Sequence, residues 1–131
     1  MSAEWFHAAR EMLAPETLGA YEARRAVFGP FTATFERVSA RFPEAGPELY
    51  EGMPDCACQV PHWGYVFKGK LRFEHIRGGD QIVGLGEAYD VPLGHRRTCL
   101  EEAETVEFSP TEDIEPHMQH VAENLARMES R

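Results

Sequence analysis

A regular series of turn signals between residues 29 and 94 constrains the fold more than any other feature of the sequence. Short runs rich in β-branched and aromatic residues alternate there with turns, at intervals of about eight to twelve residues. The turns are Gly29-Pro30, Pro43–Pro47, Gly52–Pro54, Lys68-Gly69, Gly78–Asp80, Gly86 and Pro92–Gly94. Because no helical periodicity separates them, the pattern predicts an all-β fold, an antiparallel sandwich or barrel.

Two hairpins and one strand break are expected inside this series. The hairpins would turn at Lys68-Gly69 and at Gly78–Asp80, each between two short apolar runs. In the run Phe31–Phe42 the odd-numbered residues are apolar at first and the even-numbered ones later. Since a strand changes phase only through a bulge or a break, we expect an interruption at Glu36-Arg37.

Helices are expected at both ends of the chain. Apolar residues at helical spacing predict a short N-terminal helix over about residues 3–13, which Pro15 ends. A C-terminal helix is expected over about residues 114–129, with Asp113 as its cap. Its apolar stripe consists of Ile114, Met118, Val121, Leu125 and Met128. Two heptads do not define a coiled coil, so docking on the barrel's own surface is favoured over dimerisation through this helix.

Length, charge and apolar pattern narrow the classes of protein and of partner. A chain of 131 residues with 43% hydrophobic and 27% charged residues is expected to form one domain, 1–131, with its core over about 21–110. The net charge of -9 disfavours nucleic acid and anionic membrane surfaces as partners. The first thirteen residues lack a signal-peptide pattern and no run of about 18 apolar residues occurs, which predicts a cytoplasmic protein.

Closely spaced cysteines suggest a metal site. The chain has three cysteines, and a disulfide between Cys56 and Cys58 would close a strained loop. On an extended strand residues i and i+2 point to the same side, so both thiols and His62 are expected on one face. His95, which follows the turn Pro92–Gly94, is positioned to add a fourth ligand.

The same stretch resembles the first motif of the cupin superfamily, G-x5-H-x-H-x3,4-E-x6-G. When this motif is aligned on Gly69, its glutamate falls on His62 and its two histidines fall on Cys58 and Cys56. The spacing of the motif is therefore kept while the ligand types differ. The sequence is also similar to small bacterial cupins with His-Trp-Gly-Tyr-Val before a Lys-Gly pair.

A second stretch resembles the second cupin motif, G-x5-P-x-G-x2-H-x3-N. Gly86, Pro92 and Gly94 match it, but Arg97 occupies the usual histidine position and the asparagine is absent. His95 shares the parity of Arg97 on a strand and can face the interior. The resemblance covers about residues 38–110. It implies a cupin-type double-stranded β-helix, a jelly-roll barrel, with a metal or small molecule in its mouth, frequently as a dimer.

The types of the candidate ligands indicate which metal is expected. Two thiolates and two imidazoles, from Cys56, Cys58, His62 and His95, favour one divalent transition metal, zinc before iron or copper. The alternative without metal is that both thiols are small buried apolar groups and that His62 is a hydrogen-bonded core residue.

Five further residues are weighed as functional candidates. His75 shares a strand face with Leu71 and Phe73 and could enter the barrel as a general acid or base, and a capped or surface histidine is an equally good interpretation. Arg97 could bind the carboxylate of a substrate, and Cys99 could be a spare or alternative ligand. His117 and His120 lie three residues apart on the C-terminal helix, and a solvated helix face is the preferred interpretation for both.

The sequence is compatible with three functions. The first is a metal-dependent enzyme acting on a small molecule, which requires an open coordination position. The second is a ligand-binding or sensor protein whose barrel is held together by a closed zinc site. The third is a metal-free acid/base catalyst that uses His62, His75 or His95. The apolar stripe on the last helix and aromatic residues on the outer face of the barrel also suggest a homodimer.

Overall fold

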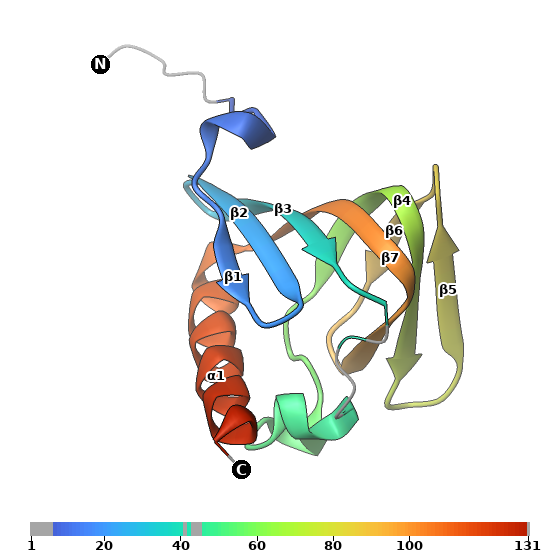
Figure 1. Cartoon of the computed structure of the whole chain (residues 1–131). Helices are drawn as coiled ribbons and strands as arrows, with labels where there is room; N and C mark the ends of the chain where they lie inside the picture. The colour runs from blue at the N-terminus through green and yellow to red at the C-terminus, as the bar shows by residue number, and fades with distance from the viewer. Residues whose placement is uncertain (1–6, 41, 43–45, 131) are drawn as a thin grey trace.

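The computed structural model describes residues 7–40, 42 and 46–130 and shows a curved antiparallel sheet with one helix packed beside it (Figure 1). The strands are β1 (Glu16–Leu18), β2 (Tyr21–Phe28), β3 (Phe31–Val38), β4 (His62–His75), β5 (Asp80–Gly84), β6 (Ala88–Val91) and β7 (His95–Pro110). The helices are the short 3-10 helices η1 (Arg10–Met12), η2 (Gly46–Tyr50) and η3 (Pro54–Cys56), and α1 (Thr111–Glu129). The prediction of an all-β barrel with a C-terminal helix is confirmed.

Two long strands organise the sheet. Its strands follow the order β1-β2-β3-β7-β4-β5, with β6 also paired to β4, and every pairing is antiparallel. Strands β4 and β7 pair from Trp63 opposite Phe108 to His75 opposite His95, with irregular register between Val66 and Leu71. This ladder curves and carries the chain from one side of the barrel to the other (Figure 1).

The hairpin predicted at Lys68-Gly69 is wrong, because β4 continues through both residues. Gly69 has a φ of 83°, and a Cβ atom on it would lie 2.0 Å from the carbonyl oxygen of Glu102 in β7. Glycine therefore permits a bulge at which the strand bends against its neighbour without reversing. The hairpin predicted at Gly78–Asp80 is confirmed, with Glu74 of β4 paired to Asp80 of β5.

The break predicted at Glu36-Arg37 is also wrong. Strand β3 pairs with both β2 and β7 in unbroken register from Phe31 to Val38. Its even-numbered side chains are buried, Glu36 among them, whereas Phe31 is 47% exposed. The inner face of the strand carries polar residues because it lines a cavity, and apolar alternation therefore indicated the wrong face.

The ends of the chain depart from the predicted helices in different ways. Of the expected helix over residues 3–13, residues 1–6 lie outside the described part, and in the remainder only η1 is helical. Helix α1 begins at Thr111, so Asp113 lies in its first turn and is not its cap. Pro116 lies inside the helix and has no N–H to donate to the carbonyl four residues earlier.

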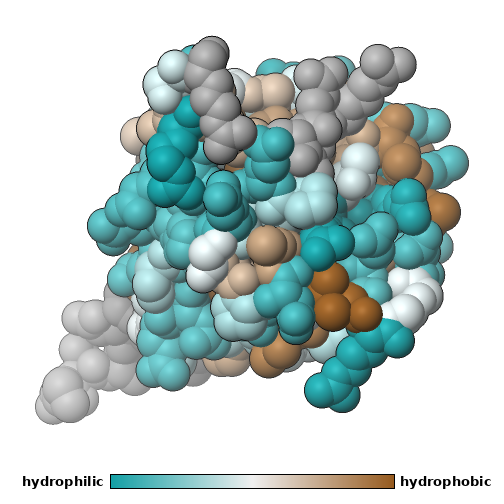
Figure 2. All heavy atoms as spheres, turned by 90° about the horizontal axis from the view of Figure 1, so that it is seen from below, coloured by the Kyte–Doolittle hydropathy of each residue, from teal (hydrophilic) through white to brown (hydrophobic). Residues whose placement is uncertain are grey.

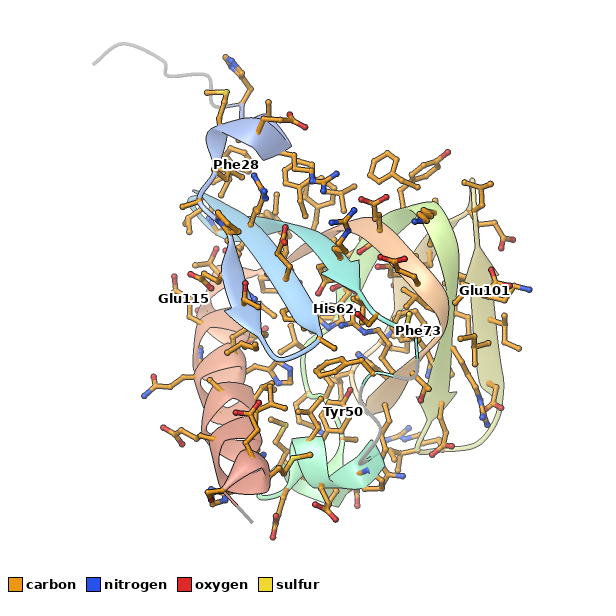
Figure 3. All side chains as sticks on the ribbon, viewed as in Figure 1. Phe28, Tyr50, His62, Phe73, Glu101 and Glu115 are labelled. Atoms are coloured by element: carbon orange, nitrogen blue, oxygen red, sulfur yellow. The ribbon has the colours of Figure 1, made fainter. Side chains whose placement is uncertain are left out.

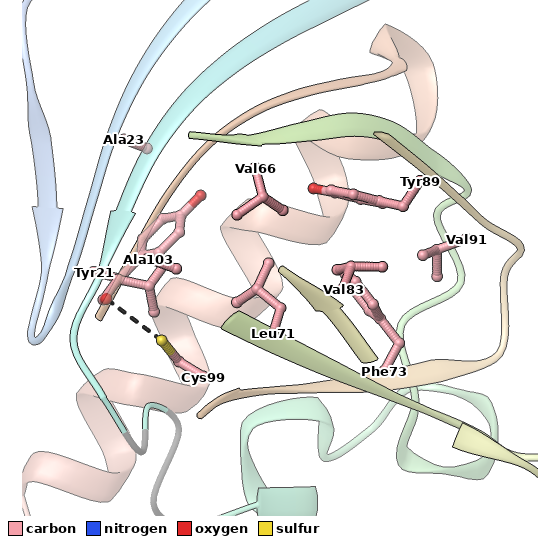
Figure 4. Close-up of a cluster of buried hydrophobic side chains, with 11 residues drawn as sticks. Tyr21, Ala23, Val66, Leu71, Phe73, Val83, Tyr89, Val91, Cys99 and Ala103 are labelled. Atoms are coloured by element: carbon pink, nitrogen blue, oxygen red, sulfur yellow. Dashed lines mark hydrogen bonds between the residues drawn. The ribbon is translucent and has the colours of Figure 1, made fainter. Parts of the chain in front are cut away.

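Two apolar clusters stabilise the barrel and fix α1 on it. The first lies between the strands and includes Leu71, Phe73 and Cys99 (Figure 4). The second joins the stripe of α1 to η2 and the segment before β4, as the preference for docking predicted. The end of the barrel where η2 and η3 lie has a mainly hydrophilic surface (Figure 2). Among the described residues, no helix has the length and apolar character that crossing a membrane requires.

Candidate metal centre

A cavity of about 60 Å³ lies between the inner face of the barrel, η2 and α1. Residues from six elements and from the segment before β4 line it, and most of the polar ones are buried. His62 projects into this interior between α1 and the strands, with Tyr50 of η2 below it (Figure 3).

Three of the predicted ligands meet at the wall of the cavity. One ligand atom each from Cys58, His62 and His95 lies within 4.8 Å of the other two, and all three residues are buried. His62 begins β4 and His95 begins β7, while Cys58 forms a β-bridge with His95 in which its N–H donates to the His95 carbonyl at 2.8 Å. Backbone pairing therefore brings the three side chains together.

The hydrogen bonds of the two histidines leave one nitrogen of each for a ligand. His95 Nδ1 lies 2.7 Å from the carbonyl oxygen of Pro92, which only accepts, so Nδ1 carries the proton and Nε2 has a free lone pair. His62 Nδ1 lies 2.8 Å from Ser109 Oγ, and its Nε2 faces Cys58 Sγ at 3.6 Å. A partner on one ring nitrogen is the usual way in which proteins orient a metal-binding histidine.

Burial sets the protonation states at this site. It lowers the pKa of His95 to about 4 and that of His62 well below its ordinary value, so both rings are neutral near pH 7. Burial also raises the pKa of the Cys58 thiol to about 12, so the thiol keeps its proton until a cation replaces it. The group is therefore uncharged in the absence of a cation.

The separation of one donor pair fits a tetrahedral metal. Zinc lies about 2.3 Å from sulfur and about 2.0–2.1 Å from nitrogen, so a tetrahedral angle places the two donor atoms about 3.6 Å apart. Cys58 Sγ and His62 Nε2 are separated by 3.6 Å. The donor set and this distance together fit a divalent transition metal.

The structure does not place Cys56 in this group. Asp55 and Cys56 have φ values of 57° and 49°, so the chain at η3 is left-handed and the alternation expected of an extended strand is lost. Arg96 Nε donates to the carbonyl oxygen of Cys56 at 2.8 Å and helps to hold this turn. The extended conformation on which the prediction for Cys56 rested is therefore wrong.

The other candidates lie in three different environments. His75 is half-buried at the end of β4, with Nε2 at 3.3 Å from Gln81 Oε1, and it is not among the residues that line the cavity. Cys99 lies in the apolar core (Figure 4), and its sulfur is 2.8 Å from the carbonyl oxygen of Glu101 and 3.5 Å from that of Val38. Arg97 lines the cavity, as predicted for a residue on the inner face.

Arg97 already binds a carboxylate of the protein itself. Its Nη1 donates to Glu36 Oε1 at 2.9 Å, and the Tyr21 hydroxyl donates to Glu36 Oε2 at 2.5 Å. Burial raises the pKa of Glu36, but the charge of Arg97 and these hydrogen bonds outweigh it and lower that pKa, so Glu36 is ionised. Burial and the charge of Glu36 raise the pKa of Glu107 well above its ordinary value, so Glu107 is protonated.

These two glutamates are functional candidates that the sequence analysis missed. Glu36 is 6% exposed and Glu107 is 4% exposed. Each belongs to an alternating set of buried residues, Thr32, Thr34 and Glu36 on β3 and Thr105, Glu107 and Ser109 on β7. A carboxylate in phase with threonine and serine on neighbouring strands is the signal that could have indicated a polar barrel interior.

His117 is not on a solvated helix face, contrary to the prediction. It lines the cavity, and its Nε2 lies 3.6 Å from Cys58 Sγ. Burial lowers its pKa to about 4. His117 follows Ile114 by three residues and precedes Val121 by four, so the helical stripe itself indicated an inward position. His120 instead contacts the carbonyl oxygen of Glu51 at 2.8 Å.

Several solved structures are similar to this chain in fold. An RmlC-like cupin from Shewanella frigidimarina NCIMB 400 has a TM-score of 0.61 and 18% identity, over 87% of this chain and 98% of that one. Ectoine synthase from P. lautus has a TM-score of 0.59 and 11% identity, over 81% of this chain and 78% of that one.

Bacillus subtilis oxalate decarboxylase is also similar, with a TM-score of 0.55 and 16% identity over 79% of this chain. The chain spans 28% of that protein's length. No protein-family model and no curated protein matches the sequence. At these identities the similarity establishes the arrangement of the backbone and leaves ligands and activity to the side chains described above.

Proposed function

Because the chain has the cupin fold, a double-stranded β-helix barrel, we propose that it binds a divalent transition metal and a small molecule in the mouth of the barrel. Cys58, His62 and His95 are the proposed protein ligands. One observation carries the proposal, the meeting of three buried ligand atoms within 4.8 Å at the wall of a cavity. Each of the three lies on a different segment, so this convergence depends on the fold of the barrel.

The proposed metal is zinc, with iron and copper as alternatives. A thiolate with imidazoles is a soft to borderline donor set, which favours these metals over manganese or magnesium. The similar oxalate decarboxylase has Mn(II) centres. All three cysteines are free thiols, which supports a reducing, cytoplasmic location.

The charge and the volume of the cavity indicate which class of small molecule it would bind. With a thiolate bound, a divalent ion contributes a net charge of +1, while Arg97 and Glu36 cancel and Glu107 is neutral. A volume of about 60 Å³ limits the ligand to a few non-hydrogen atoms beside the metal. We therefore propose a small polar ligand that is neutral or singly anionic. A bound metal would polarise an oxygen of such a molecule or activate water for isomerisation, elimination or hydrolysis.

Elemental analysis tests the metal proposal. Protein produced without an affinity tag, in medium supplemented with zinc, is expected to contain about one divalent transition metal per chain after dialysis. Chelation should remove the metal, and readdition of zinc should restore it and raise the melting temperature, because binding to the native state alone stabilises it. Metal at trace level only, after supplementation, would overturn the proposal.

We also propose a homodimer formed through the outer face of the barrel. Phe31, Trp63, Tyr65, Phe67 and Phe108 are each 39% to 53% exposed, and Trp63 packs edge-on against Phe31 and opposite Phe108. Exposed aromatic residues in such a contiguous set are typical of an interface. Light scattering is expected to give twice the chain mass of 14.8 kDa.

Two matched substitutions test this dimer. Trp63→Glu should give a monomer, since it places a charge inside the aromatic face, whereas Leu93→Glu should leave the dimer intact. Leu93 is a suitable control because it is 59% exposed and lies in the turn before β7. A mass near 14.8 kDa for the wild-type protein at high concentration would contradict the proposal.

A further inference from the structure

We propose that His117 of α1 supplies a fourth protein ligand to the metal held by Cys58, His62 and His95, so that the metal ties the C-terminal helix to the barrel. This inference rests on the proposed metal site and specifies how its coordination sphere is completed. It replaces the second thiolate expected from the sequence with an imidazole from a different element of the fold.

The position of His117 relative to Cys58 carries the inference. His117 Nε2 lies 3.6 Å from Cys58 Sγ, the same separation as that of His62 Nε2 from this sulfur. Both values equal the edge of about 3.6 Å that joins sulfur and nitrogen donors on a tetrahedral zinc ion. This distance suits a nitrogen ligand of an ion bound to Cys58 Sγ. Among the described residues, the ligand atoms that all lie within 4.8 Å of one another come from Cys58, His62 and His95, so the His117 ring would turn toward the ion to bind it.

Three groups share hydrogen bonds with the Cys58 thiol. Val60 O, His62 Nε2 and His117 Nε2 lie 3.6–3.7 Å from its sulfur. The thiol has one proton to donate and its sulfur is a weak acceptor, so these hydrogen bonds are weak. A metal ion bound by the sulfur and by both imidazoles would replace them with stronger bonds.

Contacts on both sides of His117 hold the helix in place. At its start, the N–H of Thr111 donates to Pro30 O and its hydroxyl donates to Gly29 O, both at 2.8 Å. Further along, the Asn124 amide donates to Leu49 O and to Glu51 O, both at 2.9 Å. The helix is thus fixed on the barrel by contacts that involve no ligand, and His117 is directed into the cavity before a metal binds.

Binding of His117 would close the coordination sphere. One thiolate and three imidazoles fill the four positions of a tetrahedral metal, whereas three protein ligands would leave one position open. A small anion then reaches the metal only when His117 is displaced. Binding of a ligand in the cavity is thereby coupled to α1, because the displaced imidazole belongs to that helix.

Cobalt(II) provides the probe, because its spectrum reports both the sulfur ligand and the coordination number. Wild-type apoprotein titrated with Co²⁺ is expected to show a sulfur-to-cobalt charge-transfer band and the intense visible bands of a four-coordinate site. Added thiocyanate should leave this spectrum unchanged. His117→Ala should keep the charge-transfer band, bind Co²⁺ at least about tenfold more weakly, and change its visible spectrum on addition of thiocyanate.

His120→Ala is the matched control, since it removes an imidazole from the same helix that contacts Glu51 O and not Cys58. It should bind Co²⁺ and respond to thiocyanate as the wild-type protein does. Circular dichroism of both apo variants should show wild-type helix content, because alanine favours helix.

The outcomes separate this inference from the proposal on which it rests. Identical affinity and spectra in His117→Ala and the wild-type protein, or the same changes in His120→Ala, would overturn the role of His117 and leave the three-residue site standing. Absence of a sulfur-to-cobalt band in the wild-type protein would overturn the proposed metal site and the inference together.

Discussion

Cys58→Ser, His62→Ala and His95→Ala are each expected to lose the bound metal and to lower the melting temperature of the metal-loaded protein to near that of the apoprotein. The three ligand atoms lie within 4.8 Å of one another, so each loss leaves an incomplete site. A metal present at about 1,000 times its dissociation constant stabilises the native state by about 4 kcal/mol, and this is the contribution expected to disappear. Metal content and melting curves with and without chelator measure it.

Cys99→Ser is the control for a buried cysteine outside the site. Cys99 is 1% exposed in the apolar core, so its replacement should cost part of the roughly 0.5–3 kcal/mol typical of single substitutions while the metal is retained. Cys56→Ser should also retain the metal, because Cys56 lies outside the group. Loss of metal from Cys99→Ser together with its retention in Cys58→Ser would show that the ligand assignment is wrong.

Arg97→Met is expected to destabilise the protein by about 3–5 kcal/mol in urea unfolding at pH 7. The Arg97 side chain is 14% exposed and that of Glu36 is 4% exposed, so the substitution leaves an ionised carboxylate buried without its counter-charge. Arg72→Met is the matched control at the surface. Its guanidinium lies 2.6 Å from Asp80, but both side chains are about 40% exposed, so the loss should be about 0–1 kcal/mol.

The double variant Glu36→Gln/Arg97→Met separates loss of the ion pair from the burial of a lone charge. It should recover much of the stability that Arg97→Met loses, since no ionised group then remains without a partner. If Arg97→Met is no more harmful than Arg72→Met, Glu36 does not depend on Arg97 for its ionisation.

The dependence of the unfolding free energy on acidic pH provides a second test of the ion pair between Glu36 and Arg97. The folded-state pKa of Glu36 is lowered from its ordinary value of 4.5, so its contribution is present above pH 4.5 and is lost as the pH falls toward the folded-state pKa. Glu36→Gln should therefore flatten the decline of unfolding free energy below pH 4.5. An unchanged slope would contradict the assignment of the ionised form to Glu36.

The sequence determined those features that depend on neighbours along the chain. Turn residues at regular intervals established the antiparallel fold, and the apolar stripe of the last helix established its docking face. The second hairpin was predictable because Gly78–Asp80 joins two adjacent strands. His62 and His95 could be placed on the inner face from the sequence because each begins a strand, and Cys58 is brought to them by its bridge with His95.

Only the tertiary structure decided features that depend on contacts between distant segments. Gly69 became a bulge and not a turn because its strand had to pass within van der Waals contact of Glu102 on β7. Cys56 lies outside the group of candidate ligands because η3 is left-handed. The spacing of residues along the sequence does not indicate this conformation.

The polar interior of the cavity was decided in the same way. Glu36 was hidden in the sequence because a charged residue on a strand is normally a solvent-facing one, and only its pairing with Arg97 from a distant strand makes its burial stable. His117 enters the cavity because the barrel leaves an opening where α1 packs, and the separation of 59 residues between it and Cys58 is closed by the fold alone. Side-chain chemistry could be predicted from local pattern, whereas the assembly of these groups required the three-dimensional path of the chain.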